Sequence, residues 1–296
     1  MHIIYTNMGQ TEVVGDYTMV NLFIFVVMTI LYYAFLKPRF SVADIENEKS
    51  ITDVISNQNY MSGIYFLVVL LFQFVLNTMS LVGRCGDGTG ANIAAAAYLT
   101  FVPWVLIFGV MMVVIMAFPG MKSGFSDVIG YIAVSYSANK VVTELMIDPE
   151  VDRTLTEANV DEKSRMAMQD TAQTILRILG NTSVLINQVV PANFGKFWNT
   201  MIPLMKPKYK DNMTGEATQD IKKQILELAN LRDNIGESCW YIYTGIFLIM
   251  IVQYNILTHK CTIDPRIMNE KYDDYLKEQK KEERKKKQAN SITYKL

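Results

Sequence analysis

The side chains that most often carry catalysis or bind metals are sparse in this sequence. Its 296 residues include only two histidines, His2 and His259, which stand near opposite ends. A metal centre, or a nucleophile with its base, needs several such groups brought together. We therefore expect no catalytic residue, no metal and no cofactor, and we expect that the protein is not an enzyme.

Two short motifs resemble functional loops without completing them. Gly86-Asp-Gly-Thr-Gly90 has the glycines of a phosphate-binding loop, but the lysine and hydroxyl of such a loop are missing and no strand precedes it. We expect a tight turn between helices there. Val128-Ile-Gly-Tyr131 resembles part of a potassium filter but lacks a pore helix between two spans. Neither motif predicts a ligand site.

Half of the residues are apolar, and they are concentrated in four runs without any Asp, Glu, Lys or Arg. The runs are Met19–Leu36, Ile64–Val82, Ala94–Phe118 and Ser238–Leu257. As a helix, each is long enough to cross a hydrocarbon core of about 30 Å. The first is followed by Lys37-Pro38-Arg39 instead of a cleavage site, so it does not read as a signal peptide. The sequence predicts a mainly α, multi-pass membrane protein with about four spans.

These runs divide the chain into four parts. We expect a three-span membrane module at 1–122 and a helical extramembrane domain at 123–236. A fourth transmembrane helix at 237–258 should continue the preceding amphipathic helix, and a basic helical tail at 259–296 should follow. No alternation typical of strands is present to predict a sheet.

The charges beside the spans give conflicting indications of orientation. Residues 1–18 contain no Lys or Arg, whereas Lys37, Arg39 and Lys49 follow the first span. By the positive-inside tendency, the N-terminus is outside and the 37–58 loop is cytosolic, so four spans place the C-terminus outside. The tail opposes this, because residues 260–296 hold 11 basic and 7 acidic residues. The side on which the tail lies stays open.

The three cysteines allow one disulfide within this topology. Cys85 follows the second span and Cys261 follows the fourth, so both lie on the same face, and they could pair if their Cα atoms come within reach. Cys239 lies at the opposite end of the last span. The alternative is three unpaired thiols.

Five polar side chains lie inside predicted spans and must find partners there. They are Asn21, Gln73, Asn77, Gln253 and Asn255. Gln73 and Asn77 are four residues apart and share one helix face, so we expect them, with Gln253 and Asn255, to make interhelical hydrogen bonds. No charged residue lies within a span, which disfavours an ion or substrate pathway.

The polar segment before the last span is patterned as a helix. Apolar side chains recur at helical spacing at Ile221, Ile225, Leu228, Leu231 and Ile235. No proline interrupts the junction, and Gly236 alone would only weaken it, which predicts one helix from about Ala217 to Leu257. Upstream, the pattern predicts a helix at Asp161–Leu179 and a short apolar element at Ser183–Val190.

A basic and aromatic segment lies between these elements, and Pro203 and Pro207 forbid a long helix in it. Its candidate contact residues are Phe194, Lys196, Phe197, Trp198, Lys206, Lys208, Tyr209 and Lys210. Aromatic and basic side chains are favoured in contact surfaces, so the segment can be interpreted as a patch that faces a partner. A segment packed on its own domain is the alternative.

The tail also has more than one interpretation. Glu–Lys pairs four residues apart within Lys271–Lys287 favour a solvated helix. The Arg284–Lys287 cluster could instead contact anionic lipid or nucleic acid.

One pattern in the C-terminal half is similar to a known family. It consists of Asn234-Ile-Gly-Glu-x-x-Trp-Tyr-Ile-x-Thr-Gly, then Gln253-Tyr-Asn255, together with Asn187-Gln-x-x-Pro-Ala-Asn-Phe-x-x-Phe-Trp and Pro203-Leu-Met-Lys206. This pattern resembles a membrane-embedded structural protein of large icosahedral nucleocytoplasmic double-stranded DNA viruses that have an internal membrane. The resemblance covers residues 180–258, and residues 1–150 carry no matching motif.

The resemblance implies a minor capsid protein in the inner viral membrane beneath the capsid, and in membrane derived from the host endoplasmic reticulum during assembly. Its expected partners are the lipid bilayer and the major and minor proteins of the shell, with no small-molecule substrate. A channel or transporter is the alternative, and it would require a water-lined polar face shared by several spans.

Overall fold

The chain is helical throughout the part that can be described. A computed structural model describes residues 5–85, 89–146, 182–262 and 265–292. Within these ranges no strand forms, and the only β-type pairing is an isolated antiparallel bridge between Met146 and Met205. The predicted mainly α fold class is confirmed for these residues. The predicted helix at Asp161–Leu179 lies outside them.

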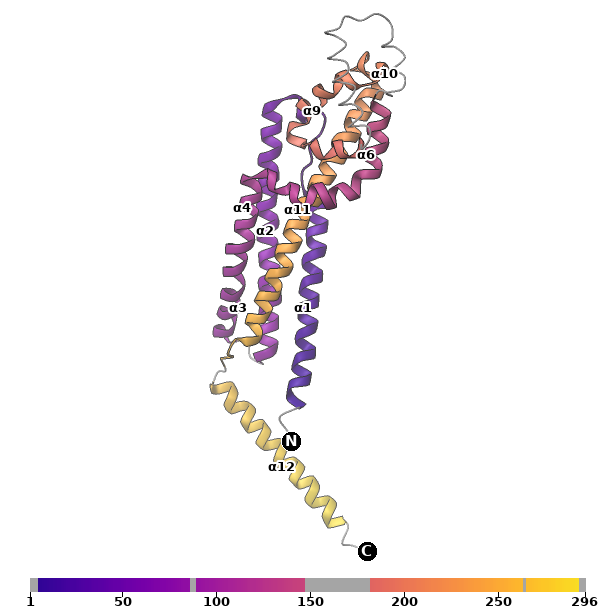
Figure 1. Cartoon of the computed structure of the whole chain (residues 1–296). Helices are drawn as coiled ribbons and strands as arrows, with labels where there is room; N and C mark the ends of the chain where they lie inside the picture. The colour runs from indigo at the N-terminus through magenta and orange to yellow at the C-terminus, as the bar shows by residue number, and fades with distance from the viewer. Residues whose placement is uncertain (1–4, 86–88, 147–181, 263–264, 293–296) are drawn as a thin grey trace, which may run out of the picture. The chain divides into compact units, whose positions relative to one another are not determined.

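Among the described residues, four helical stretches are long and apolar enough to cross a membrane. They are α1 (Tyr5–Leu31) with η1 (Tyr32–Leu36), α2 (Glu48–Cys85), α3 (Gly90–Pro103) with η3 (Trp104–Gly109) and α4 (Val110–Ala117), and α11 (Glu216–Thr258) (Figure 1). Each bears apolar side chains that are more than half exposed, such as Phe23, Leu71, Val113 and Met250. Exposed apolar surface of this kind is typical of helices that face lipid. The prediction of four such helices is confirmed by their length and composition.

The third stretch shows how local sequence sets helix geometry. The Thr89 hydroxyl accepts a hydrogen bond from the backbone N–H of Asn92 and so caps the start of α3. Pro103 ends the regular part of this helix because proline has no N–H to donate, and the backbone continues through the wider π-helical turns of η3. The turn predicted at Gly86–Gly90 lies partly outside the described residues.

Shorter helices occupy the polar segments between these stretches. They are η2 (Asp44–Glu46), η4 (Pro119–Lys122), α5 (Ser123–Phe125), η5 (Ser126–Gly130), α6 (Tyr131–Leu145), η6 (Thr182–Gln188), η7 (Pro191–Asn193), α9 (Phe194–Met201), η8 (Ile202–Leu204) and α10 (Pro207–Lys210). Pro203 and Pro207 lie in the first turns of η8 and α10, where a missing N–H costs least. The segment therefore breaks into short helices, as the prolines require.

The helices group into two compact units, and each unit draws on segments that are far apart in sequence. Unit 1 consists of Met1–Leu22, Leu70–Val105 and Leu248–Leu296. Unit 2 consists of Phe23–Val69 and Leu106–Phe247. Each of the four long stretches contributes residues to both units, so unit 2 contains parts of all four candidate spans. It also contains the described part of residues 123–236, called the polar domain below.

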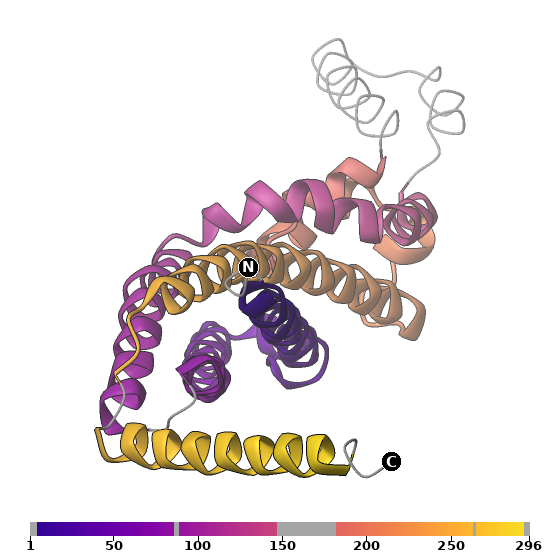
Figure 2. The ribbon, with the colours of Figure 1, turned by 90° about the horizontal axis from the view of Figure 1, so that it is seen from below.

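The main core of unit 2 is formed largely by buried residues of α6, η6, α9 and the first half of α11, and Figures 1 and 2 show α6 beside this part of α11. Its buried members include Val134, Ala138, Leu145, Ile186, Phe194, Trp198, Ile221 and Ile225. The backbone N–H of Lys206 donates to the carbonyl of Leu145 over 2.9 Å and fastens the end of α6 to the segment before α10. Burial of apolar surface, at about 25 cal/mol per Å², makes this core the main source of the domain's stability.

Two glycines let η5 approach the backbone of α11 closely. A Cβ atom at Gly236 would lie 2.6 Å from the backbone nitrogen of Ser126, and one at Gly130 would lie 2.5 Å from the carbonyl oxygen of Arg232. Real Cβ atoms do not come this close to backbone atoms. Gly236 is therefore required for packing, and is more than the weak point in a helix that the sequence suggested.

Unit 1 ends in α12 (Pro265–Ile292), the yellow helix of Figures 1 and 2. Almost all of its described side chains are exposed, including the large rings of Tyr272 and Tyr275. Lys277 and Asp274 form an ion pair of 3.0 Å on its surface. The helix α12 itself extends from Pro265 to Ile292, within the region where the Glu–Lys spacing predicts a helical tail.

Candidate anchoring site

The structure places the aromatic side chains of the predicted partner patch in the core of unit 2. Phe194, Trp198 and Tyr209 are at most 4% exposed, and Phe197 is half-buried. The Phe194 and Trp198 rings stack with centroids 6.1 Å apart. The expectation that these rings face a partner is corrected by this burial. Each large ring removed from water stabilises the domain by about 1.5–3 kcal/mol, which a surface position would forgo.

The lysines of the same segment lie on the outside. Lys196, Lys208 and Lys210 are exposed, whereas Lys206 is partly buried and its Nζ donates to the carbonyl of Thr143 over 3.2 Å. The Tyr209 hydroxyl donates to Glu144 Oε1 over 2.9 Å, and this bond and burial raise the pKa of Tyr209. Three of the eight patch residues are therefore exposed lysines.

A buried ionic cluster lies where the spans in unit 2 meet the polar domain. Lys37 follows η1, Lys122 ends η4, and Glu237 lies on α11. Glu237 Oε2 is 2.9 Å from Lys37 Nζ and 2.5 Å from Lys122 Nζ, while its Oε1 accepts a hydrogen bond from the Tyr33 hydroxyl. The Asp233 carboxylate is 3.9 Å from Lys122. One carboxylate thus joins three segments that are distant in sequence.

Burial and charge act in opposite directions on the two lysines. Burial lowers the pKa of Lys37, and the Glu237 carboxylate offsets this only in part. Burial would also lower the pKa of Lys122, but Glu237 and Asp233 together outweigh it and hold that pKa above its ordinary value. Removal of one partner from such a cluster leaves a buried charge uncompensated. The cluster therefore depends on all of its members.

Further polar contacts fasten loops of unit 2 to α11. The Asn230 amide donates to the carbonyl of Phe40 over 2.9 Å. The Arg232 guanidinium donates to the carbonyl of Ile186 and lies 3.6 Å from Asp233. The loop after the first span and the helix η6 are thus both held by polar side chains of one helix.

In unit 1, four helices meet at Asn77 on α2. Its Oδ1 accepts hydrogen bonds from Asn21 on α1 over 3.1 Å and from Gln253 on α11 over 2.8 Å. Its Nδ2 donates to Thr100 on α3 over 3.0 Å. Ser80 adds a bond of 3.4 Å to Gln253. The predicted interhelical residues Asn77 and Gln253 are brought together here.

The other two predicted interhelical residues take no part in this network. Gln73 is buried, and its Oε1 has no hydrogen-bond partner among the described residues. Asn255 is half-buried, and its backbone carbonyl accepts from the Thr258 hydroxyl. The spacing of four residues predicts that Gln73 and Asn77 share one helix face. It does not show which of the two forms hydrogen bonds with side chains of other helices.

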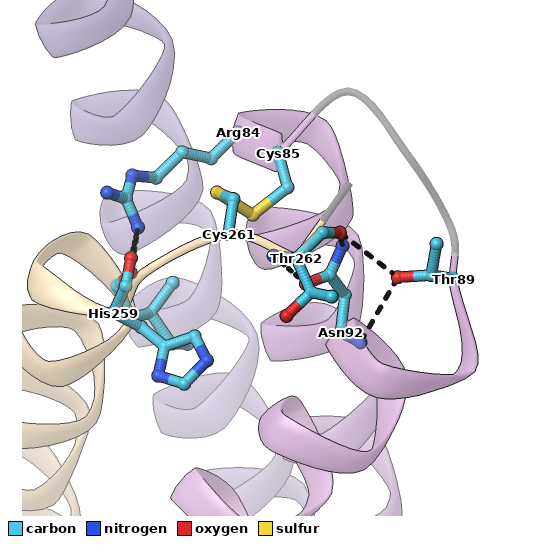
Figure 3. Close-up of a disulfide and its surroundings, with 8 residues drawn as sticks. Arg84, Cys85, Thr89, Asn92, His259, Cys261 and Thr262 are labelled. Atoms are coloured by element: carbon cyan, nitrogen blue, oxygen red, sulfur yellow. Dashed lines mark hydrogen bonds between the residues drawn. A yellow bond between two sulfur atoms is a disulfide. The ribbon is translucent and has the colours of Figure 1, made fainter. Parts of the chain in front are cut away.

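A disulfide and an arginine close one end of the helices in unit 1 (Figure 3). Cys85 at the end of α2 is bonded to Cys261, with an S–S distance of 2.06 Å and Cα atoms 5.3 Å apart. Arg84 Nη1 donates to the carbonyls of Ile256 and His259, at 2.6 and 2.7 Å. These carbonyls belong to the last turn of α11 and the residue after it, where no helical donor remains for them. Cys239 is a free thiol.

The segment that follows the disulfide is also held in place by hydrogen bonds. The Asn92 side chain and the backbone of Thr262 exchange two hydrogen bonds of 2.9 and 3.1 Å, and the Thr89 hydroxyl donates to the same carbonyl of Thr262 over 3.3 Å (Figure 3). The beginning of α3 is thereby tied to the segment that leaves α11. Every contact here lies within unit 1.

Sequence reasoning missed the ionic cluster because its members are 85 to 200 residues apart. A signal was nevertheless present, since Lys37, Lys122 and Glu237 each stand at the end of an apolar run. For the patch, the spacing of Phe194, Trp198 and Met201 was the missed sign of an inward helix face.

No group of three or more metal-binding side chains occurs in the parts of the chain that the structure describes. The arrangement of contacts can hold helices together and fix a polar domain to them. Comparison with models of protein families, with curated proteins and with solved structures finds no match to this chain.

Proposed function

We propose that this chain is a structural protein of a large icosahedral double-stranded DNA virus, a minor capsid protein that anchors the internal viral membrane to the capsid shell. The observation that carries the proposal is α11, which supplies Ile221 and Ile225 to the core of the polar domain and continues without a break into an apolar span. Such a helix joins a protruding domain to the bilayer. The resemblance of residues 180–258 supplies the virion setting.

The contacts within each unit support a role in anchorage. In unit 2 the domain core, the ionic cluster around Glu237 and parts of all four candidate spans belong to one compact body. In unit 1 the Asn77 network and the disulfide link the helices to one another. A protein that must resist being pulled from a membrane benefits from ties of this kind.

The surface that meets the shell is, in this proposal, the basic face formed by Lys196, Lys208 and Lys210. These lysines are exposed on the polar domain, and their charge suits an acidic surface on a major or minor capsid protein. They replace the aromatic rings as the contact residues because the rings are buried.

The disulfide supports an orientation for the proposed protein. Disulfides persist in oxidising compartments, so the Cys85–Cys261 end should face the lumen of the endoplasmic reticulum during assembly. A span places its two ends on opposite faces, which puts the loop with Lys37, Arg39 and Lys49 in the cytosol, in agreement with the positive-inside tendency. The polar domain is then cytosolic, where the shell assembles, and α12 begins on the lumenal side.

Removal of the basic face tests the proposal. Lys196→Gln, Lys208→Gln and Lys210→Gln combined should reduce incorporation into particles while membrane insertion stays normal. The matched control is Lys277→Gln, Lys280→Gln and Lys281→Gln on α12, which removes the same charge elsewhere. Equal incorporation of both triple variants and the unaltered chain would exclude this face. Trp198→Ala would not test contact with the shell in the same way. The Trp198 ring is buried, so its loss costs about 3–5 kcal/mol and damages the domain itself.

The channel or transporter alternative predicts solute flux from the purified chain in liposomes. In unit 1 the polar side chains of the spans bond to one another at Asn77, which favours a role as interhelical contacts. We expect no flux above that of empty liposomes.

A further inference from the structure

A cavity of about 110 Å³ lies beside the ionic cluster of unit 2. Its charged lining residues are Lys37, Lys122, Asp233 and Glu237, and amide side chains such as Asn234 also line it. Each of the four candidate spans, or the segment just beyond it, contributes to the wall. The cavity is thus at the level where the apolar helices give way to the polar domain.

The two lysines in this wall pair with the same carboxylate oxygen. Each lysine ammonium has three N–H donors, yet Lys37 and Lys122 share a single carboxylate oxygen, Glu237 Oε2. The 3.9 Å between Lys122 and Asp233 is beyond hydrogen-bonding distance. The side chain of Lys37 is only 4% exposed, so its remaining donors need partners in the protein or in the cavity.

Asn234 is a second sign of a ligand. It is 8% exposed and lines the cavity, and its side chain makes no hydrogen bond to another described residue. A polar group bound in the cavity would give this amide a partner. The unmet donors of two lysines and one amide thus border the same space.

The composition of the wall indicates the class of ligand. Ammonium donors suit anionic oxygen atoms, above all those of phosphate, and Asp233 offers a carboxylate for a positive group next to it. Ile55, Ile115 and Met116 give the same cavity an apolar side. A group that combines phosphate, ammonium and hydrocarbon at the border of a membrane is the headgroup of a zwitterionic phospholipid.

We propose that this cavity binds the headgroup of a zwitterionic phospholipid, with its phosphate on Lys37 and Lys122 and its ammonium group toward Asp233. A lipid held there would fill the junction between the spans and the polar domain within unit 2. The inference does not depend on a role in a virion, because it rests on the cavity and its unmet donors.

Two variants test the site without removing the carboxylate at its centre. Asn234→Leu puts an apolar side chain of similar size into the wall and breaks no hydrogen bond among the described residues. Lys122→Gln removes one ammonium and leaves the pair of Lys37 and Glu237 intact. The matched control is Asn199→Leu on the exposed face of α9, away from the cavity.

The experiment uses the full chain, purified in detergent and freed of lipid. Its thermal unfolding midpoint is measured with dihexanoyl phosphatidylethanolamine, dihexanoyl phosphatidylglycerol or inorganic phosphate, and native mass spectrometry counts the lipids that the untreated protein retains. We expect the ethanolamine lipid to raise the midpoint, and to bind about tenfold more weakly to each cavity variant, the loss of one charge-assisted hydrogen bond. Asn199→Leu should behave as the unaltered chain.

Each other result has a definite meaning. An equal shift with inorganic phosphate supports an oxyanion site but overturns the lipid headgroup, and a preference for phosphatidylglycerol overturns the role of Asp233. The same response from all four proteins, with no lipid retained, overturns the proposal and leaves water as the occupant. If a variant does not fold, lipid retention by the unaltered chain still decides whether a headgroup is bound.

Discussion

Lys37 Nζ and Glu237 Oε2 lie 2.9 Å apart, although 200 residues separate them and both side chains are at most 6% exposed. The pair joins the end of the first span to the point on α11 where the polar domain gives way to the last span. Lys122 shares the same oxygen. This cluster links three segments of unit 2 through one carboxylate oxygen.

The cluster predicts how strongly substitution of each of its members lowers the unfolding free energy. Glu237→Gln leaves two buried ammonium groups without their carboxylate and should cost about 3–5 kcal/mol of unfolding free energy. Lys37→Met should cost less, because Lys122 continues to pair with Glu237. Denaturant unfolding in detergent measures both, and Lys223→Met, in an exposed pair with Glu227, is the control with an expected change below about 1 kcal/mol. Equal stability of the Glu237 and Lys223 variants would contradict the account.

The disulfide predicts that loss of a bonded cysteine lowers the stability of the protein more than loss of the free one. Cys85→Ser should lower the unfolding free energy by about 2–5 kcal/mol, and reduction of the unaltered chain should have the same effect. Cys239→Ser is the control, since that thiol is free. Alkylation under denaturing, non-reducing conditions should label one cysteine per chain by mass spectrometry. Three labels on protein taken from particles would show that the bond is absent.

The network at Asn77 predicts that one amide matters far more than another. Asn77→Leu removes the partner of Asn21, Thr100 and Gln253, and at about 0.6 kcal/mol for each interhelical bond it should cost roughly 2 kcal/mol. Asn255→Leu makes the same chemical change on a half-buried site outside the network. Thermal unfolding in detergent should separate the two variants clearly. A loss as large for Asn255→Leu would remove Asn77 from its central role.

Two helical glycines should respond in opposite directions to the same substitution. Gly236→Ala brings a methyl group against the backbone of Ser126 and should destabilise the protein, because backbone atoms cannot move aside cheaply. Gly63→Ala meets no atom within 4 Å and should stabilise α2 by about 0.5–1 kcal/mol. Unfolding midpoints of the two variants provide the measurement. A stabilising Gly236→Ala would mean that η5 does not pack on α11 as described.

The four helices that are long and apolar enough to cross a membrane could be predicted, because a bilayer demands about twenty apolar residues in succession, a property of the local sequence. The helix expected from about Ala217 to Leu257 is observed from Glu216 to Thr258, since apolar spacing and the lack of proline act locally as well. Composition could not show whether the rings of the aromatic segment lie in the core of the domain or on its surface. The spacing of Phe194 and Trp198 relates them to one helix face, and only the fold shows that this face is inward.

Local sequence patterns could not predict contacts between segments that are far apart in the sequence. Cys85 and Cys261 could be placed on one face by counting spans, but their separation of 5.3 Å between Cα atoms arises from how α2 and α11 end beside each other in unit 1. The cluster of Lys37, Lys122 and Glu237 likewise depends on packing. Charges at the ends of apolar runs mark where such pairs can form without showing which ones do.

Cross-linking mass spectrometry on purified particles, with a lysine-reactive reagent, measures whether the polar domain contacts the shell. We expect links from Lys196, Lys208 or Lys210 to shell proteins, and none from those shell proteins to the lysines of α12, which lie across the membrane in the proposed orientation. Absence of the chain from particles, or links to the shell from α12 alone, would contradict the proposed anchoring of membrane to capsid.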